Sequence, residues 1–308
     1  MITILLATYN GEKYIAEQLD SLLSQTYQDF KVIVRDDCST DGTYAILEDY
    51  AGKYPGKFNV SKNEVNTGGA KHNFIQMMIE YKDDYVMLCD QDDVWLPDKI
   101  KITLAKMKEA ESDYGADTPL LVHTDLRVVD EKLETVSPSY RYAMNSNYQN
   151  TSLRHQVIQN TLTGCTCMYN RALADLVMEA PSFMIMHDWW LMLTAAAFGR
   201  IAPMETQTVL YRQHSQNEIG AKNVRTLKYK IRKLLDHQSI KVALNETYLQ
   251  AQSLREVYAD KLSTEQREFL RAYRDIPNHG KFGRWIKVCR LGVLKHGIAR
   301  KVATFIFI

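Results

Sequence analysis

Hydrophobic residues follow two alternating periods along the first third of the chain. Four short apolar runs have the length of strands: Ile2–Ala7, Lys31–Arg35, Phe58–Lys62 and Tyr85–Cys89. Between these runs the apolar residues recur at helical spacing, as at Ile15, Leu19 and Leu22, which indicates amphipathic helices. This repetition of strand and helix predicts an α/β protein with a mainly parallel central sheet and helices on both faces.

The middle of the chain is less regular. We expect a strand at Leu120–Val129, a shorter one within Thr161–Tyr169, a helix at Asp188–Phe198 and a strand at Thr208–Arg212. The segment Ser137–Asn150 is rich in Tyr, Asn and Ser and is predicted to be a long polar loop. A loop of this length in a compact domain is often a functional lid.

From about residue 220 onward the pattern is helical. Four helices are expected, at Lys222–His237, Ser239–Tyr258, Ser263–Tyr273 and Arg284–Ala303. The third begins with the residues Ser-Thr-Glu-Gln, which resemble a capping box. The sequence therefore predicts two parts: an α/β domain over residues 1–220 and a helical region over residues 221–308.

Composition excludes some classes of protein. The 308 residues are 45% hydrophobic and 24% charged with a formal net charge of +1, which is typical of a globular protein and gives no support to nucleic-acid binding. Five cysteines, without the spacing of a metal site, favour a reduced cytoplasmic compartment. We expect neither a signal peptide nor a transmembrane helix, because no basic leader precedes the first strand and no apolar stretch is long enough to span.

Three polar clusters follow predicted strands. They are Thr8–Glu12, Asp36–Gly42 and Asp90–Asp93. The carboxyl ends of parallel strands meet at one edge of a sheet, and this edge is where ligands bind in such folds. We therefore expect these clusters to form one site.

Asp90-Gln91-Asp92-Asp93 packs three carboxylates against one strand end. Such charges repel one another unless a cation neutralises them. Mg²⁺ and Mn²⁺ prefer oxygen ligands and commonly bind one or two carboxylates together with substrate phosphates. The alternative is a solvated acidic turn at the start of a helix, where negative charge is also favoured.

Other candidate residues each carry an alternative interpretation. The Asp36-Asp37 pair could accept hydrogen bonds from a base and a ribose, whereas neighbouring Ser and Asp residues have ordinary roles in turns. Asp188, in His-Asp-Trp-Trp, could accept a proton from a hydroxyl beside sugar-binding aromatics, or could cap a helix whose tryptophans lie in the core. His214 could bind a metal or phosphate, or be an ordinary polar residue. Arg212 could neutralise a diphosphate or form a surface salt bridge.

Several known signatures are missing from the sequence. It contains no GxGxxG after a strand, no P-loop, no HExxH and no GxSxG. The chain instead carries, in order, TYNGEKYIAEQLDSLLSQTY, RDDCSTDGT, NTGGAKHNF, DQDDVWLPDK, TGC, HDWW and YRQH. In this order the motifs resemble the family 2 glycosyltransferases, and most closely the streptococcal-type rhamnosyltransferases of cell-wall polysaccharide synthesis. The motifs cover residues 1–215.

The resemblance implies a GT-A fold with a nucleotide-binding half over about residues 1–115 and an acceptor-binding half over about residues 116–220. It assigns donor binding to Thr8, Tyr9, Glu12, Asp36, Asp37, Lys71 and Asp90. It assigns a divalent cation, Mn²⁺ or Mg²⁺, to Asp92 or, one residue later, to Asp93, and gives His214 a position that can complete metal or diphosphate binding. It assigns the catalytic base to Asp188 and acceptor binding to Thr163, Gly164, Trp189 and Trp190. Cys165 departs from the pattern, because relatives have TGG where this chain has TGC.

The activity implied is an inverting transfer of L-rhamnose from dTDP-β-L-rhamnose to a hydroxyl of a lipid-linked saccharide. A UDP-hexose or UDP-N-acetylhexosamine donor is the alternative within the family, and a non-catalytic scaffold is the alternative outside it. The enzyme is expected at the cytoplasmic face of the plasma membrane. The basic end of the chain, with Trp285, Ile286, Val288 and Cys289 on another face of its helix, could contact that membrane, the catalytic domain or a second copy in a homodimer.

Overall fold

The computed structural model describes residues 1–214 and 236–308, and the chain divides into two compact units. The sheet unit consists of Met1–Tyr140, Leu162–Ala180 and Gly199–Ala221, and the helical unit of Arg141–Thr161, Pro181–Phe198 and Lys222–Ile308. The expected domain boundary near residue 220 and nearly all of the expected helix Lys222–His237 lie outside the described residues.

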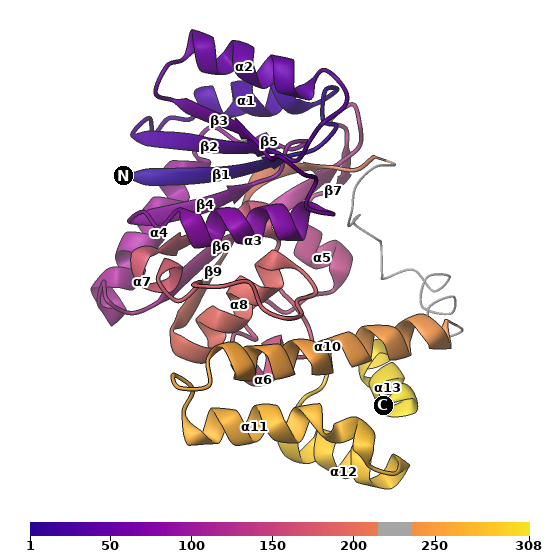
Figure 1. Ribbon diagram of the computed structural model, residues 1–308. Helices are drawn as coiled ribbons and strands as arrows, with labels where there is room; N and C mark the ends of the chain where they lie inside the picture. Colours follow the sequence, from indigo (N-terminus) through magenta and orange to yellow (C-terminus); the bar gives the residue numbers. More distant parts are fainter. Residues whose placement is uncertain (215–235) are drawn as a thin grey trace. The chain divides into compact units, whose positions relative to one another are not determined.

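The described strands form one sheet, all of it in the sheet unit (Figure 1). They are β1 (Ile2–Thr8), β2 (Phe30–Asp36), β3 (Phe58–Lys62), β4 (Tyr85–Cys89), β5 (Val94–Trp95), β6 (Leu120–Val129), β7 (Thr135–Ser137), β8 (Cys167–Asn170) and β9 (Arg200–Arg212). Their order is β3-β2-β1-β4-β8-β6-β9-β5, with β7 paired to β6. The first four strands are parallel, as the sequence predicts. Beyond β4 the sheet is mixed rather than mainly parallel, because β8 pairs antiparallel with β4 and β6, β5 pairs antiparallel with β9, and β6 and β9 are parallel.

Helices cover both faces of this sheet. They are α1 (Ile15–Leu23), α2 (Thr43–Lys53), α3 (Ala70–Glu80), α4 (Lys99–Tyr114), the short α7 (Arg171–Ala174) and the 3₁₀ turn η1 (Gly164–Thr166). Alternate residues of β1, such as Ile4, share a core with Leu19 of α1 and Met107 of α4. Helix α3 lies in front of the strands in Figure 1 and buries Phe74 and Met78.

The helical unit is built from short and long helices. They are α5 (Tyr140–Met144, beginning on the last residue of the sheet unit's first segment), α6 (Leu153–Gln156), α8 (His187–Phe198), α10 (His237–Val257), α11 (Thr264–Arg274), η2 (Ile276–Asn278), α12 (Lys281–Leu291) and α13 (Ile298–Phe307). The capping box predicted at Ser263 is present, with Gln266 as its partner. No helix within the described ranges is both long and apolar enough to cross a membrane.

Three sequence predictions differ from the structure. The expected polar loop Ser137–Asn150 contains α5, and strand β9 begins at Arg200 rather than Thr208. The expected helix Arg284–Ala303 is two helices, because Gly292 (φ 68°) and Gly297 (φ 92°) adopt left-handed backbone conformations that end one helix and precede the next.

The register of the parallel strands determines where the candidate site lies. Thr8 at the end of β1 lies beside Asp36 at the end of β2, and Leu6 lies beside Cys89 at the end of β4. Residues that follow these strands, including Asp37 and Asp90, therefore emerge along one edge of the sheet, as the sequence predicts.

Two glycines give a matched test of packing in the sheet unit. A Cβ added at Gly199 would overlap the carbonyl oxygen of Pro119, whereas one added at Gly52 in α2 meets nothing within 4 Å. We expect Gly199→Ala to lower the free energy of unfolding by about 1–3 kcal/mol through overpacking. Gly52→Ala should raise it by up to about 1 kcal/mol through helix propensity. Urea unfolding followed by circular dichroism measures both, and equal effects of the two substitutions would contradict this packing.

Candidate active site

Asp36 and Asp37, the first two carboxylates at this edge of the sheet, are buried and accept hydrogen bonds from other residues of the protein. Asp36 is fully buried, and its carboxylate accepts hydrogen bonds from the Thr8 hydroxyl (3.0 Å) and from both the backbone N–H (2.9 Å) and the hydroxyl (2.5 Å) of Ser39. This network joins the ends of β1 and β2. Asp36 and Thr8 are thus brought together, with their polar atoms directed at each other.

Asp37 holds the segment that leads into α3. Its Oδ1 accepts hydrogen bonds from Asn63 (2.7 Å) and from the backbone N–H of Thr67 (2.8 Å), and its Oδ2 accepts one from the Thr67 hydroxyl (2.8 Å). Lys71, in the first turn of α3, is half-buried. A base-reading role for Asp37 remains a prediction that these contacts do not test.

The loop after β1 is tied to its neighbours through backbone contacts. Tyr9 is half-exposed, and its N–H and C=O both bond to the side chain of Gln91, at 2.8 and 2.9 Å. Glu12 accepts a hydrogen bond from the N–H of Gly42 (2.9 Å). The three polar clusters predicted from the sequence therefore meet at one edge.

The segment Asp90–Asp93, here called the acidic loop, contacts the end of β9. His214 Nε2 lies 2.8 Å from Asp92 Oδ2, and both side chains are largely buried. The His214 ring also packs on Tyr14 of the segment before α1, with 4.7 Å between ring centroids. Two of the predicted metal ligands, separated by more than a hundred residues in sequence, are thus side by side.

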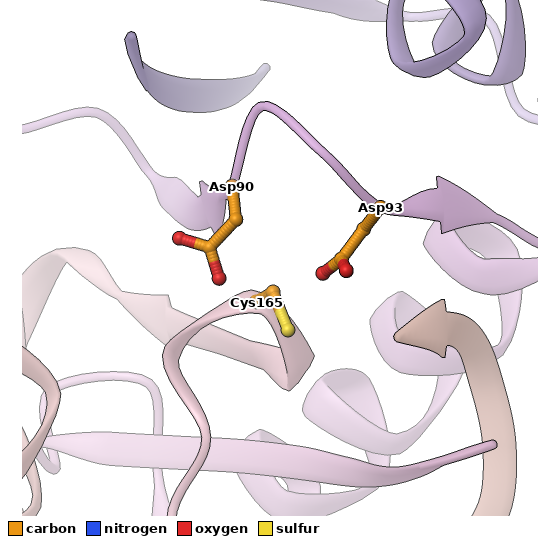
Figure 2. Close-up of side chains that lie close together, drawn as sticks. All are labelled: Asp90, Asp93 and Cys165. Carbon is orange, nitrogen blue, oxygen red and sulfur yellow. The ribbon is translucent and has the colours of Figure 1, made fainter. Parts of the chain in front are cut away.

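The third predicted metal ligand, Asp93, lies in a group with Asp90 and Cys165. Figure 2 shows its carboxylate directed toward Asp90 and the Cys165 thiol, and one ligand atom from each of these residues lies within 4.8 Å of the others. Asp93 is fully buried. Its Oδ1 accepts the Arg212 backbone N–H (3.1 Å), and its Oδ2 accepts no hydrogen bond from the described residues.

Burial and like charge act together on this group. Burial raises the pKa of Asp93 well above its usual range, and the charges of Asp92 and Asp90 raise it further. Burial likewise raises the pKa of the Cys165 thiol, with Asp93 and Asp90 adding to the effect. A buried carboxylate oxygen without a partner fits a divalent cation that prefers oxygen ligands. The residues present therefore fit Mn²⁺ or Mg²⁺.

Arg212, at the end of β9, binds the backbone of the acidic loop. Its guanidinium donates from Nε to the carbonyl of Asp92 (2.9 Å) and from Nη1 to the carbonyl of Glu131 (2.7 Å), and it pairs with Glu17. Only 2% of the residue is exposed. The guanidinium forms its ion pair from a buried position rather than on the surface, and neutralisation of a diphosphate by it stays a prediction.

Lys99 lies buried beneath the acidic loop, and sequence reasoning missed it. Its ammonium contacts Thr208 (3.4 Å) and the face of the Trp95 ring (4.5 Å). Burial lowers the pKa of Lys99 to about 8, and the nearby Asp93 carboxyl opposes this effect. The signal was the helical period, because Lys99, Thr103 and Met107 occupy one buried stripe of α4.

The remaining predicted residues divide between the units. Gly164 is buried in η1, and the carbonyl of the half-buried Thr163 accepts a hydrogen bond from the Thr166 hydroxyl (2.7 Å); both belong to the sheet unit. Asp188, Trp189 and Trp190 belong to the helical unit.

Asp188 lies in the first turn of α8, the position that the sequence predicts. Its Oδ1 accepts hydrogen bonds from the backbone N–H of Trp189 (2.6 Å) and from Asn160 (3.3 Å). The Trp189 indole is half-buried and donates to the Gln156 carbonyl (2.7 Å). Trp190 is fully buried and stacks on Tyr258, so of the two tryptophans only Trp189 reaches the surface of this unit.

Similarity to known proteins identifies the family of this chain. Residues 3–176, more than half of the chain, match the family described as Glycosyl transferase family 2. A dTDP-rhamnosyl transferase, RfbG, from Shigella flexneri is 29% identical over 239 residues, which cover 73% of this chain and 77% of that protein. Mycobacterial relatives are 28% identical over 70% of this chain, which spans only 59% of their length.

Solved structures share the fold. TarS 1–349 of Staphylococcus aureus in complex with UDP-GlcNAc aligns with a TM-score of 0.56 at 19% identity, covering 92% of this chain and 82% of that one. In the longer TarS structure the match covers only 43% of that chain. The mannosyltransferase PcManGT from Pyrobaculum calidifontis, in complex with GDP-Man and Mn²⁺, aligns with a TM-score of 0.53 at 18% identity, covering 94% and 74%. The predicted GT-A fold is thereby confirmed.

The charge of Asp93 gives a pH-dependent test. Because the pKa of Asp93 is raised in the folded state, the native protein retains a proton that the unfolded chain loses above about pH 4. Stability from this group is therefore complete at low pH and declines as pH rises. Asp93→Asn keeps an acceptor for the Arg212 N–H and removes the charge. We expect the variant to gain stability relative to wild type as pH rises above about 4, by about 1.4 kcal/mol for each pH unit over which the native protein keeps the proton.

Urea unfolding in the presence of EDTA measures this difference at each pH. Asp113→Asn, at an exposed position of α4, is the matched control and should follow wild type. Parallel stability profiles for wild type and Asp93→Asn would contradict a raised pKa of the buried Asp93 carboxylate in the folded protein.

Proposed function

We propose that this chain, which belongs to glycosyl transferase family 2, transfers L-rhamnose from dTDP-β-L-rhamnose to a hydroxyl of a lipid-linked saccharide. Use of a nucleotide-sugar donor is a property of its family. The observation that carries the proposal is the edge of the sheet, where the acidic loop, the Asp92–His214 contact and the Asp36–Asp37 pair lie together. The rhamnose donor is supported by similarity to the Shigella dTDP-rhamnosyl transferase.

The acidic loop is assigned to the diphosphate of the donor. Asp92 and His214 are the proposed cation ligands, with Asp93 as the alternative carboxylate one residue later and Asp90 beside the donor ribose. A bound Mn²⁺ or Mg²⁺ would supply positive charge to the diphosphate as it leaves. Other residues hold the proposed ligands in place. Arg212 binds the backbone of the acidic loop, and the Tyr14 ring packs on the His214 ring.

Thr8, Tyr9, Glu12, Asp36, Asp37 and Lys71 are the proposed contacts for the rest of the donor. The hydrogen bonds around Asp36 and Asp37 fix the ends of β1 and β2, so these contacts would be preorganised rather than formed on binding. A rigid edge of this kind reduces the entropy cost of holding the nucleotide.

Asp188 is the proposed general base. Hydrogen bonds from Trp189 and Asn160 hold its carboxylate at the start of α8. The acceptor oxygen would bond to the anomeric carbon from the face opposite the diphosphate, its proton would pass to Asp188, and the bond to dTDP would break. One displacement inverts the centre, so a β donor gives an α linkage. Trp189, Thr163 and Gly164 are the proposed acceptor contacts, with Trp190 supporting α8 from its buried position.

Transfer assays with a donor panel test this function. Purified protein with Mn²⁺ is expected to consume dTDP-L-rhamnose in preference to UDP-glucose, UDP-galactose and UDP-N-acetylglucosamine when given a lipid-linked saccharide acceptor. Asp188→Asn should reduce kcat by about 10²–10⁴-fold with little change in donor affinity, because a general base contributes to the chemical step alone. Asp260→Asn, at an exposed position of the same unit, is the matched control.

The outcomes separate the alternatives. Preferential use of a UDP-sugar, the donor type found in the TarS complex, would retain the family and overturn the rhamnose assignment. Full activity of Asp188→Asn would overturn its role as base. Donor binding without turnover of any donor would favour a non-catalytic scaffold.

A further inference from the structure

The last two helices of the helical unit direct apolar side chains outward. On α12, Phe282 and Ile286 are 77% and 67% exposed. On α13, Ile298, Val302 and Ile306 are 84%, 46% and 50% exposed. Within each helix these residues are four positions apart and so form one stripe along its surface. Amphipathic helices of a globular protein normally bury such a stripe.

The inward faces of these helices are partly polar. Arg284 of α12 bonds to the carbonyls of His279 (2.6 Å) and Pro277 (2.8 Å), and α13 buries Thr304. The Trp285 indole donates to the carbonyl of Phe305 (2.6 Å), which joins the two helices. Of the face suggested by the sequence, Ile286 and Cys289 are exposed, whereas Val288 is buried and Trp285 holds α13. Phe282, which the sequence did not assign to this face, is also exposed.

Basic side chains accompany the apolar stripes. From Lys281 to Ile308 the sequence has seven Lys and Arg residues and no Asp or Glu. Lys281, Arg290 and Lys301 are exposed. Lys287 is held within the unit by Asp275 (2.7 Å). We call the exposed residues of both kinds the basic apolar face.

We propose that the basic apolar face, formed by Phe282, Ile286, Ile298, Val302 and Ile306 with Lys281, Arg290 and Lys301, binds the surface of a bilayer containing anionic lipids. Apolar side chains enter the boundary between headgroups and acyl chains, and cations at their margin attract anionic headgroups. This inference deepens the proposed function, because a lipid-linked acceptor is presented by a bilayer.

Charge favours a membrane over a second copy of the chain as the occupant. In a symmetric dimer the same patch lies on both sides of the interface, so the basic residues of one copy would approach those of the other. The sequence from Lys281 onward offers no acidic residue to compensate this repulsion. An anionic bilayer complements both the apolar and the basic residues.

Vesicle sedimentation tests the proposal with the full chain. Wild type is expected to sediment with vesicles of phosphatidylglycerol and phosphatidylcholine, and to bind pure phosphatidylcholine vesicles much more weakly. Phe282→Ser with Ile298→Ser should reduce the partition coefficient by about tenfold or more, as should Arg290→Gln with Lys301→Gln. Added salt should weaken binding of the wild type, because it screens the headgroup charge.

Matched controls lie in the sheet unit. Val65→Ser with Val136→Ser removes two side chains that are 76% and 66% exposed, and Lys101→Gln with Lys132→Gln removes two exposed cations. Both control pairs should bind vesicles as wild type does. Circular dichroism establishes that each variant is folded.

Two results would overturn the proposal. One is equal vesicle binding by wild type, the face variants and the controls. The other is a wild-type dimer in light scattering that Phe282→Ser with Ile298→Ser converts to a monomer without any effect on vesicle binding. Donor turnover measured without vesicles is independent of this face. If the wild type turns over donor but does not bind vesicles, only the membrane inference is refuted. If it binds vesicles but does not turn over donor, only the proposed function is refuted.

Discussion

Electrostatic repulsion within the acidic loop is the constraint around which the sheet unit is organised. Three carboxylates lie within four consecutive residues, and one of them, Asp93, is fully buried. Two unit charges about 4 Å apart at a protein surface interact by about 4 kcal/mol. The loop keeps its conformation because Arg212 binds its backbone, His214 meets Asp92 and the Lys99 ammonium lies beneath it.

These contacts do not compensate all of the negative charge of the acidic loop, and the charge that remains bears on function. Oδ2 of Asp93 accepts no hydrogen bond from the described residues, and the raised pKa of that group reflects the cost of ionising it there. A divalent cation would remove that cost and would at the same time meet the diphosphate of a donor. The burial and like charge of these carboxylates would thus favour binding of a cation by the acidic loop.

Sequence reasoning located the edge of the sheet because parallel topology follows from short periodic patterns. The strands β3, β4 and β6 begin and end at the predicted residues, and Asp92 lies beside His214, although the metal role of both stays a prediction. The position of Lys99 was missed, since a lysine in a helix pattern is ordinarily taken as solvent-exposed. The first half of β9 was missed because Arg200–Gln207 is partly polar and only partly buried.

Other features depend on tertiary contacts that no local pattern reveals. The outward direction of Phe282 and Ile286 depends on Trp285 bonding to α13, and the break between α12 and α13 depends on the left-handed conformations of two glycines. The buried position of Trp190 depends on Tyr258, far along the chain. Periodicity identified these segments as helical, but their inner and outer faces are decided by partners distant in sequence.

We propose that the acidic loop holds a divalent cation against the donor diphosphate. Crystals grown with Mn²⁺ and dTDP, measured at a wavelength where manganese scatters anomalously, test this directly. We expect an anomalous peak bonded to a carboxylate of the acidic loop and to the diphosphate, with His214 adjacent. A dTDP molecule bound at this edge with no manganese peak at the acidic loop, or a peak elsewhere in the chain, would contradict it.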